Sequence, residues 1–117
     1  MGPVRLGVVP VPCLENKEMT MVTYISLMNF TDKGIQGVKD TTKRAAAAKE
    51  VAGRFGVTMR EIYWTLGKYD LVCVLDAQDE TSLTAFNLAI AAQGNVRSQS
   101  LRAFTASEMD KVLAKLP

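Results

Sequence analysis

The sequence predicts an α+β fold of the ferredoxin-like, split βαβ kind, with the order β-α-β-β-α-β and one further helix at the C-terminus. Four segments have strand-like patterns, and helical segments follow the first and the third of them. Residues 61–76, EIYWTLGKYDLVCVLD, have the form of a β-hairpin around a glycine-containing turn. This topology gives a four-stranded antiparallel sheet in which the first and third strands are central, and the third, LVCVL, is the most apolar.

The first half of the chain supplies one strand and one interrupted helix. Residues 1–20 contain three prolines and no periodicity, so we expect an irregular N-terminal extension before a single domain at residues 21–117. Residues 22–30 alternate as a strand does, and residues 31–55 form a helix whose first part, weakened by two glycines, precedes an Ala-rich second part. Its expected buried stripe is Ala47, Val51 and Phe55.

The second half repeats the strand and helix pattern. Residues 57–66 and 70–77 are the two strands of the hairpin. A helix follows from an acidic first turn at residue 78 to Gly94, where glycine favours a helix end. Residues 96–105 form the fourth strand, and a short helix from Ser107 completes the domain.

Composition excludes several classes of function. A net charge of +2 gives no argument for nucleic acid or an anionic membrane, and no apolar stretch approaches the roughly 20 residues of a spanning helix. Prolines interrupt the N-terminal apolar run and no cleavage site follows, so a cytoplasmic protein is expected. The chain has no histidine, which removes His-based triads, His-ligated haem and His-containing zinc sites. We expect neither a cofactor nor a metal.

The hairpin decides which side chains share a face of the sheet. A turn of even length places Val72 and Val74 on one face of the sheet. Ile25, Leu27 and Leu101 belong to the same face, and we expect this aliphatic group to meet the helices. The opposite face then holds Tyr24, Ser26, Met28, Ile62, Trp64, Cys73, Ser98, Ser100, Arg102 and Phe104. That face is too apolar to be left in water, so we predict a symmetric homodimer that packs these faces around a partly polar cavity.

Seven residues are candidates for binding a small molecule: Tyr24, Ser26, Trp64, Tyr69, Ser98, Ser100 and Arg102. Trp64 and Tyr24 either stack on an aromatic ligand or form the core of the interface. Arg102 and its neighbouring serines either bind a carboxylate or phosphate, or are the solvated polar side of an edge strand. No catalytic residue and no metal ligand is assigned.

The segment Gly67-Lys68-Tyr69-Asp70 has two interpretations. It is either a ligand-contacting loop, with Tyr69 as a lid and Asp70 as an acid or base, or a hairpin turn. In a turn, glycine supplies a positive φ and aspartate accepts hydrogen bonds from nearby backbone N–H groups. The turn chemistry favours the structural interpretation.

The segments TYISLMNFTDKGI, REIYWTLGKYDLVCVLDA and GNVRSQSLRAFT resemble the GYD domain family, a bacterial and archaeal family of the dimeric α/β-barrel superfamily. The resemblance covers residues 22–116 and implies the fold and self-association, with no established reaction. We therefore expect a homo-oligomer that binds a small molecule or has a structural or regulatory role at the helix-free sheet face. The alternative is a cofactor-independent monooxygenase or isomerase for an aromatic molecule, with Tyr69, Asp70 and Arg102 as working residues.

Overall fold

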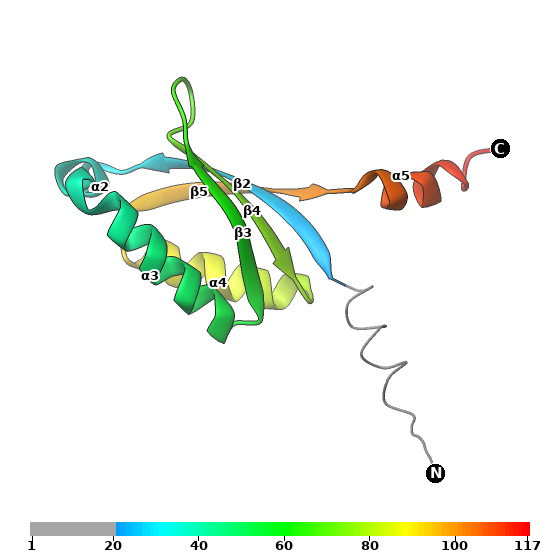
Figure 1. Cartoon of the computed structure of the whole chain (residues 1–117), viewed down its shortest axis with the longest axis horizontal. Helices are drawn as coiled ribbons and strands as arrows, with labels where there is room; N and C mark the ends of the chain where they lie inside the picture. Colours follow the sequence, from blue (N-terminus) through cyan, green and yellow to red (C-terminus); the bar gives the residue numbers. More distant parts are fainter. Residues whose placement is uncertain (1–20) are drawn as a thin grey trace, which may run out of the picture.

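The structure is a computed structural model that describes residues 21–117; the extension expected at residues 1–20 lies outside the described residues. One antiparallel sheet carries two longer helices on one side (Figure 1). In chain order the elements are β2 (Val22–Phe30), α2 (Asp32–Gln36), the 3₁₀ helix η1 (Val38–Asp40), α3 (Thr41–Arg54), β3 (Val57–Trp64), β4 (Leu71–Ala77), α4 (Glu80–Ala92), β5 (Val96–Ala103) and α5 (Ala106–Leu113).

The sheet has the strand order β3-β4-β2-β5, with all neighbours antiparallel. This confirms the ferredoxin-like topology, with β2 and β4 in the centre and β3 and β5 at the edges. The predicted grouping of side chains is also confirmed, because Ser26 lies opposite Cys73 on β4 and Ser100 on β5, and Ile25 lies opposite Val74 and Leu101.

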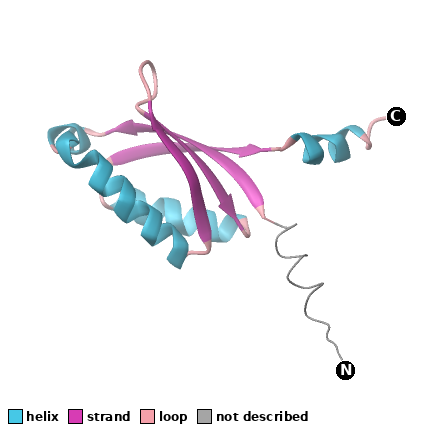
Figure 2. Ribbon diagram, in the orientation of Figure 1, coloured by secondary structure: helices cyan, strands magenta, loops and turns pink. Residues whose placement is uncertain are grey.

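The prediction of which face the helices cover is wrong. Figure 2 shows that helices α3 and α4 lie on one side of the sheet. The side chains on that face, Tyr24, Ser26, Cys73 and Leu75, are buried. The face left without helices carries the aliphatic group that was expected to be covered. We call this second surface the uncovered face and define it by Ile25, Leu27, Tyr63, Val72, Val74 and Leu101.

The core lies between the sheet and the two helices. Leu83 and Phe86 of α4 and Ala52 of α3 pack with Tyr24, Cys73 and Leu75 of the sheet. The larger strand residues Met59 and Leu75 fill this layer together with the small side chains of Ala52 and Cys73. On α3 the predicted stripe is partly wrong, since Ala47 is exposed and Ala48 and Ala52 take its place.

A β-bulge at Arg60 changes the edge strand β3. Met59 lies opposite Leu75 and Glu61 opposite Val74, so Arg60 is an additional residue between them. The Arg60 guanidinium forms an ion pair with Asp76 at 2.8 Å, and the Thr23 hydroxyl donates to the same carboxylate at 2.8 Å. The bulge therefore produces a polar corner of Thr23, Arg60 and Asp76 beside the uncovered face.

The hairpin turn has the chemistry that the sequence predicted. Gly67 has a φ of +116°, and the Asp70 carboxylate accepts the backbone N–H of Phe30 at 2.9 Å and the Asn29 amide at 3.4 Å. The Asp70 N–H in turn donates to the Met28 carbonyl oxygen at 2.8 Å. Asp70 thus fastens the turn to the end of β2.

The described helices are too short or too polar to cross a membrane. Thr31 and Asp79 accept hydrogen bonds at the N-termini of α2 and α4 from the N–H groups of Gly34 and Ser82. Helix α5 begins with a capping box, in which Thr105 and Glu108 each accept a backbone N–H of the other. It stands off from the sheet at the end of β5 (Figure 1).

Candidate functional site

A partly enclosed cavity of about 80 Å³ lies between the sheet and helices α3 and α4. Its walls are apolar and come from both central strands, from β3 and from both helices. The apolar lining includes Met28, Met59, Ile62, Leu71, Phe86 and Ile90. A concave, apolar site with a few convergent polar groups is typical of small-molecule binding.

Arg44 is the charged residue of the cavity. Its guanidinium is half-buried and donates to the carbonyl oxygens of Gly37, at 2.6 Å, and Gly34, at 3.2 Å. These bonds use two of the five N–H groups of an arginine, and they hold the side chain between α2 and α3. Within residues 21–117, no aspartate or glutamate lines the cavity, so Arg44 makes it electropositive.

Hydroxyl and amide groups supply the remaining polar lining. Ser26 is 2% exposed at the sheet, Ser98 lies on β5, and Asn87 projects from α4. The Asn87 amide donates to the Ser100 hydroxyl at 3.0 Å, which connects α4 with the edge strand β5. Of the seven residues predicted to bind a ligand, the structure therefore brings Ser26 and Ser98 into the cavity and places Ser100 beside it.

The Cys73 thiol also lines the cavity, deep in the sheet. It is 1% exposed, and burial raises its pKa to about 11. The thiol is therefore protonated at neutral pH, and because the thiolate is the reactive form, Cys73 acts as a small apolar side chain.

Tyr24 lies outside the cavity, at the other end of the covered face. Its hydroxyl is buried and has no hydrogen-bond partner among the described residues. Burial is the largest cause that raises its pKa, followed by the nearby Glu80 carboxylate, while Arg102 acts in the opposite direction. Tyr24 is a core residue beneath the N-terminus of α4, not a stacking platform in the cavity.

The remaining candidates are separated from one another. Trp64, on β3, donates its indole N–H to the Thr41 hydroxyl at 3.0 Å, whereas the Tyr69 hydroxyl donates to the side-chain oxygen of Gln99 at 3.3 Å on the uncovered side. Arg102 stacks on Phe104 at 4.3 Å and forms an ion pair with Glu108 of α5 at 3.5 Å. Trp64 thus contacts helix α3, Tyr69 contacts strand β5 from the hairpin turn, and Arg102 contacts the base of α5.

Sequence reasoning missed several polar residues that line the cavity, among them Arg44 and Asn87. A signal for Arg44 was present, because Thr41, Arg44, Ala45 and Ala48 recur at the three- and four-residue spacing of one helix face. An arginine near the start of an Ala-rich helix is, however, equally typical of a solvated helix face. Only the packing of α3 shows that the Arg44 side chain turns inward.

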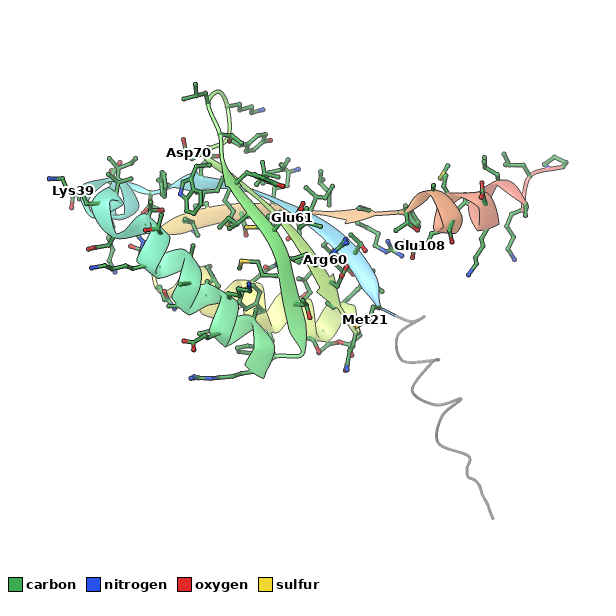
Figure 3. All side chains as sticks on the ribbon, viewed as in Figure 1. Met21, Lys39, Arg60, Glu61, Asp70 and Glu108 are labelled. Carbon is green, nitrogen blue, oxygen red and sulfur yellow. The ribbon has the colours of Figure 1, made fainter. Side chains whose placement is uncertain are left out.

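Figure 3 labels five charged side chains, and none of them lines the cavity. Arg60 and Glu61 lie on the edge strand, Lys39 in η1, and Glu108 on α5. Among residues 21–117, no group of three or more potential metal-ligating side chains is close enough to hold an ion.

The profile of the GYD domain family matches residues 24–113, which is most of the described chain. The protein belongs to the GYD domain family. The match begins at the third residue of β2 and extends through the end of α5.

A relative of this GYD-domain protein from Thermus thermophilus is 31% identical over 90 residues. The alignment covers 76% of this chain and 95% of the relative, which is named glutamine synthetase and cystathionine beta-lyase binding protein. The two proteins therefore share the domain over almost the full length of the relative.

Among solved structures, MtbAldR is similar with a TM-score of 0.59 and 12% identity. The superposition covers 86% of this chain, but the chain spans only 58% of MtbAldR, and at this identity the similarity concerns the fold alone. A second solved structure, of a protein from Thermus thermophilus, has a TM-score of 0.48 and 24% identity to this chain. The superposition covers 73% of this chain and 95% of that protein.

Proposed function

We propose that this GYD-domain protein is a self-associating binding protein that holds a small molecule in the cavity between the sheet and helices α3 and α4. The cavity itself carries the proposal. It combines apolar walls, one arginine and several neutral polar groups, and this combination suits a ligand with an apolar body and one polar or anionic end.

The dimensions limit the ligand. A cavity of roughly 150 Å³ admits benzene, so the enclosed part of this site, about 80 Å³, takes a short aliphatic chain. The polar end of the ligand then lies toward Arg44, where an anion gains charge-assisted hydrogen bonds. A ligand with about six heavy atoms, each contributing on the order of 1 kcal/mol or less, gains at most about 6 kcal/mol on binding, so we expect a dissociation constant of tens of micromolar or weaker.

Thermal-shift and calorimetric titrations with butyrate, butanol and butylamine test the chemistry of the site. We expect butyrate to stabilise the protein most and butylamine least. Arg44→Met should remove the preference for the anion, while Lys43→Met, an exposed neighbour on the same helix, should leave it unchanged. The proposal fails if none of the three probes binds, or if Ile90→Trp, which fills the cavity, binds butyrate as the wild type does.

Self-association rests on the uncovered face, as part of the same proposal. Four strands spaced about 4.8 Å apart, with about eight residues each, give this face a footprint of roughly 500 Å². Its apolar side chains include Tyr63 and Leu101, which are 53% and 42% exposed. Glu61, Arg97 and Gln99 lie on the edge strands around this apolar centre. An apolar centre with a polar rim is the usual composition of a protein interface.

A charge placed in the centre of the uncovered face tests the dimer. Leu27→Glu should convert a dimer to a monomer in light scattering coupled to size-exclusion chromatography. Leu88→Glu makes the same change on the outer side of α4, where Leu88 is 66% exposed, and should leave the dimer intact. Equal masses for the wild type and Leu27→Glu would contradict this part of the proposal.

A second candidate function is regulation through a protein partner. It is favoured by the name of the Thermus relative, which describes binding to glutamine synthetase and cystathionine beta-lyase. Calorimetric titration of this protein with both enzymes from its own host is the direct test. Saturable heat of binding to either enzyme would support this role, and no heat with either would remove it.

The alternative of a cofactor-independent monooxygenase or isomerase stays a prediction. The side chains proposed to work together, Tyr69, Asp70 and Arg102, make separate contacts with Gln99, with the end of β2 and with α5. Turnover of an aromatic substrate that is lost in both Tyr69→Phe and Arg102→Gln would revive it.

A further inference from the structure

Helix α5 packs extensively against no other helix or strand of the described chain. It continues from the end of β5 and stands beyond the sheet, away from α3 and α4 (Figures 1 and 2). The contact that fixes its base is the ion pair between Arg102 and Glu108 at 3.5 Å. Most of the surface of α5 is therefore available to another molecule.

The two sides of α5 face different directions. Ser107, Glu108 and Lys111 line a groove whose other wall is the polar corner of Thr23, Arg60 and Asp76 on the same chain. The apolar side chains recur with helical spacing on the remaining side of α5 and its C-terminal continuation. They are Met109, Val112, Leu113 and Leu116, and between 41% and 64% of each is exposed.

Within residues 21–117, α5 makes too few contacts to be stable as a helix by itself. Isolated helices shorter than about 12 residues are marginal in water, and most helical stability in proteins comes from burial of an apolar face. The capping box provides hydrogen-bond acceptors for backbone N–H groups at the start of α5, but the helix has only eight residues. The polar side of α5 faces its own sheet, and residues 21–117 leave its apolar side largely exposed. A different molecule that buries this side would supply the missing stabilisation.

We propose that the apolar side of α5 packs against a second copy of this chain and completes the dimer. The inference rests on the proposed self-association through the uncovered face. Leu101 of β5 belongs to that face, and α5 begins five residues later at the end of the same strand, so the apolar surface continues from one to the other. A second copy seated on the uncovered face is therefore the nearest molecule to α5.

The area of the uncovered face supports the same partner. Its footprint of roughly 500 Å² is smaller than the roughly 800 Å² that each partner contributes to a standard interface. Phe104, 52% exposed between β5 and α5, and the four apolar residues of α5 supply the additional area. A helix that clasps the second copy thus enlarges the interface toward the usual size.

Analytical ultracentrifugation of full-length variants tests the clasp. Leu113→Glu should raise the dimer dissociation constant by at least about tenfold, because it places a charge in a buried apolar contact. Ser107→Glu introduces the same residue on the polar side of α5 and should leave the constant unchanged. Leu113→Gln is the milder variant if Leu113→Glu folds poorly, which urea unfolding of the dilute monomer will show.

The outcomes separate the clasp from the dimer itself. If Leu113→Glu and Leu113→Gln dimerise as the wild type does, while Leu27→Glu is monomeric, the uncovered face remains the interface and the clasp is refuted. If the wild type is monomeric at all concentrations, both the clasp and the self-association are refuted. Weakening by Leu113→Glu and Ser107→Glu alike would also refute the clasp, since it assigns contact to one side of the helix only.

Discussion

Replacement of Gly34 by alanine should destabilise the protein, although the sequence alone suggests the opposite. Gly34 lies inside helix α2, where alanine is favoured over glycine by about 1 kcal/mol. In the folded chain, however, a Cβ at this position would overlap the backbone carbonyl oxygen of Asn95 and lie 3.3 Å from the Phe30 ring. The obstacle is backbone and has no rotamer by which to move away.

The magnitude follows from what must move. The Asn95 carbonyl oxygen accepts the N–H of Thr31 at 3.0 Å, and a shift on the order of 1 Å breaks that bond at a cost of about 0.5–1.5 kcal/mol. Overpacking a close contact adds about 1–3 kcal/mol. After subtraction of the helix-propensity gain, we expect a net loss of about 1–3 kcal/mol in the free energy of unfolding.

Urea denaturation followed by the fluorescence of Trp64, the single tryptophan, measures this loss. Gly53→Ala is the matched control, because Gly53 lies in α3 and a Cβ added there would have no atom within 4 Å. That variant should be stabilised by about 0.5–1 kcal/mol. If Gly34→Ala is as stable as the wild type, the close approach of α2 to Asn95 is not what requires glycine.

Three further predictions concern the turn, the buried thiol and the cap of α5. Asp70→Ala should lower the free energy of unfolding by about 1–3 kcal/mol, because the Phe30 N–H loses its acceptor. If Asp70→Asn recovers most of the lost stability, the accepting oxygen matters and the charge does not. In a Cys13→Ser background, the Cys73 thiol should react with a disulfide reagent only on unfolding. The pKa of Cys73 is raised from 9.0 to about 11 in the folded protein, so the unfolded chain loses the thiol proton first. The free energy of unfolding should therefore fall as the pH rises from 9 to 11. Fast labelling of the native protein at pH 7 would contradict the burial of the thiol. The backbone N–H of Thr105 holds the pKa of Glu108 below its usual 4.5. The contribution of this cap to stability is therefore fully present above pH 4.5 and is lost as the pH falls through the lowered pKa. An NMR titration of Glu108 should therefore give a value below 4.5 in the wild type and the ordinary value in a variant that disrupts the capping box; equal values would count against the cap.

Much of the architecture was predictable because it depends on local chemistry. Alternation along residues 22–30 and 71–77, glycine at the hairpin turn and capping residues at Thr31 and Asp79 are short-range signals, and they fixed the elements and the strand order. The placement of Ser26 and Cys73 on the same face of the sheet followed from the two-residue period of a strand. The separation of side chains into two faces needed no further information.

Which of those faces the helices cover was decided only by the tertiary structure. Both faces are apolar, so polarity could not distinguish them; close packing against Ala48 and Ala52 favoured the side with Ser26 and Cys73. The same packing turned Arg44 inward and formed the cavity between helices and sheet. The sequence by itself therefore determined the elements, their order and the grouping of side chains, while long-range packing of α3 and α4 decided where a ligand and a second copy have room to bind.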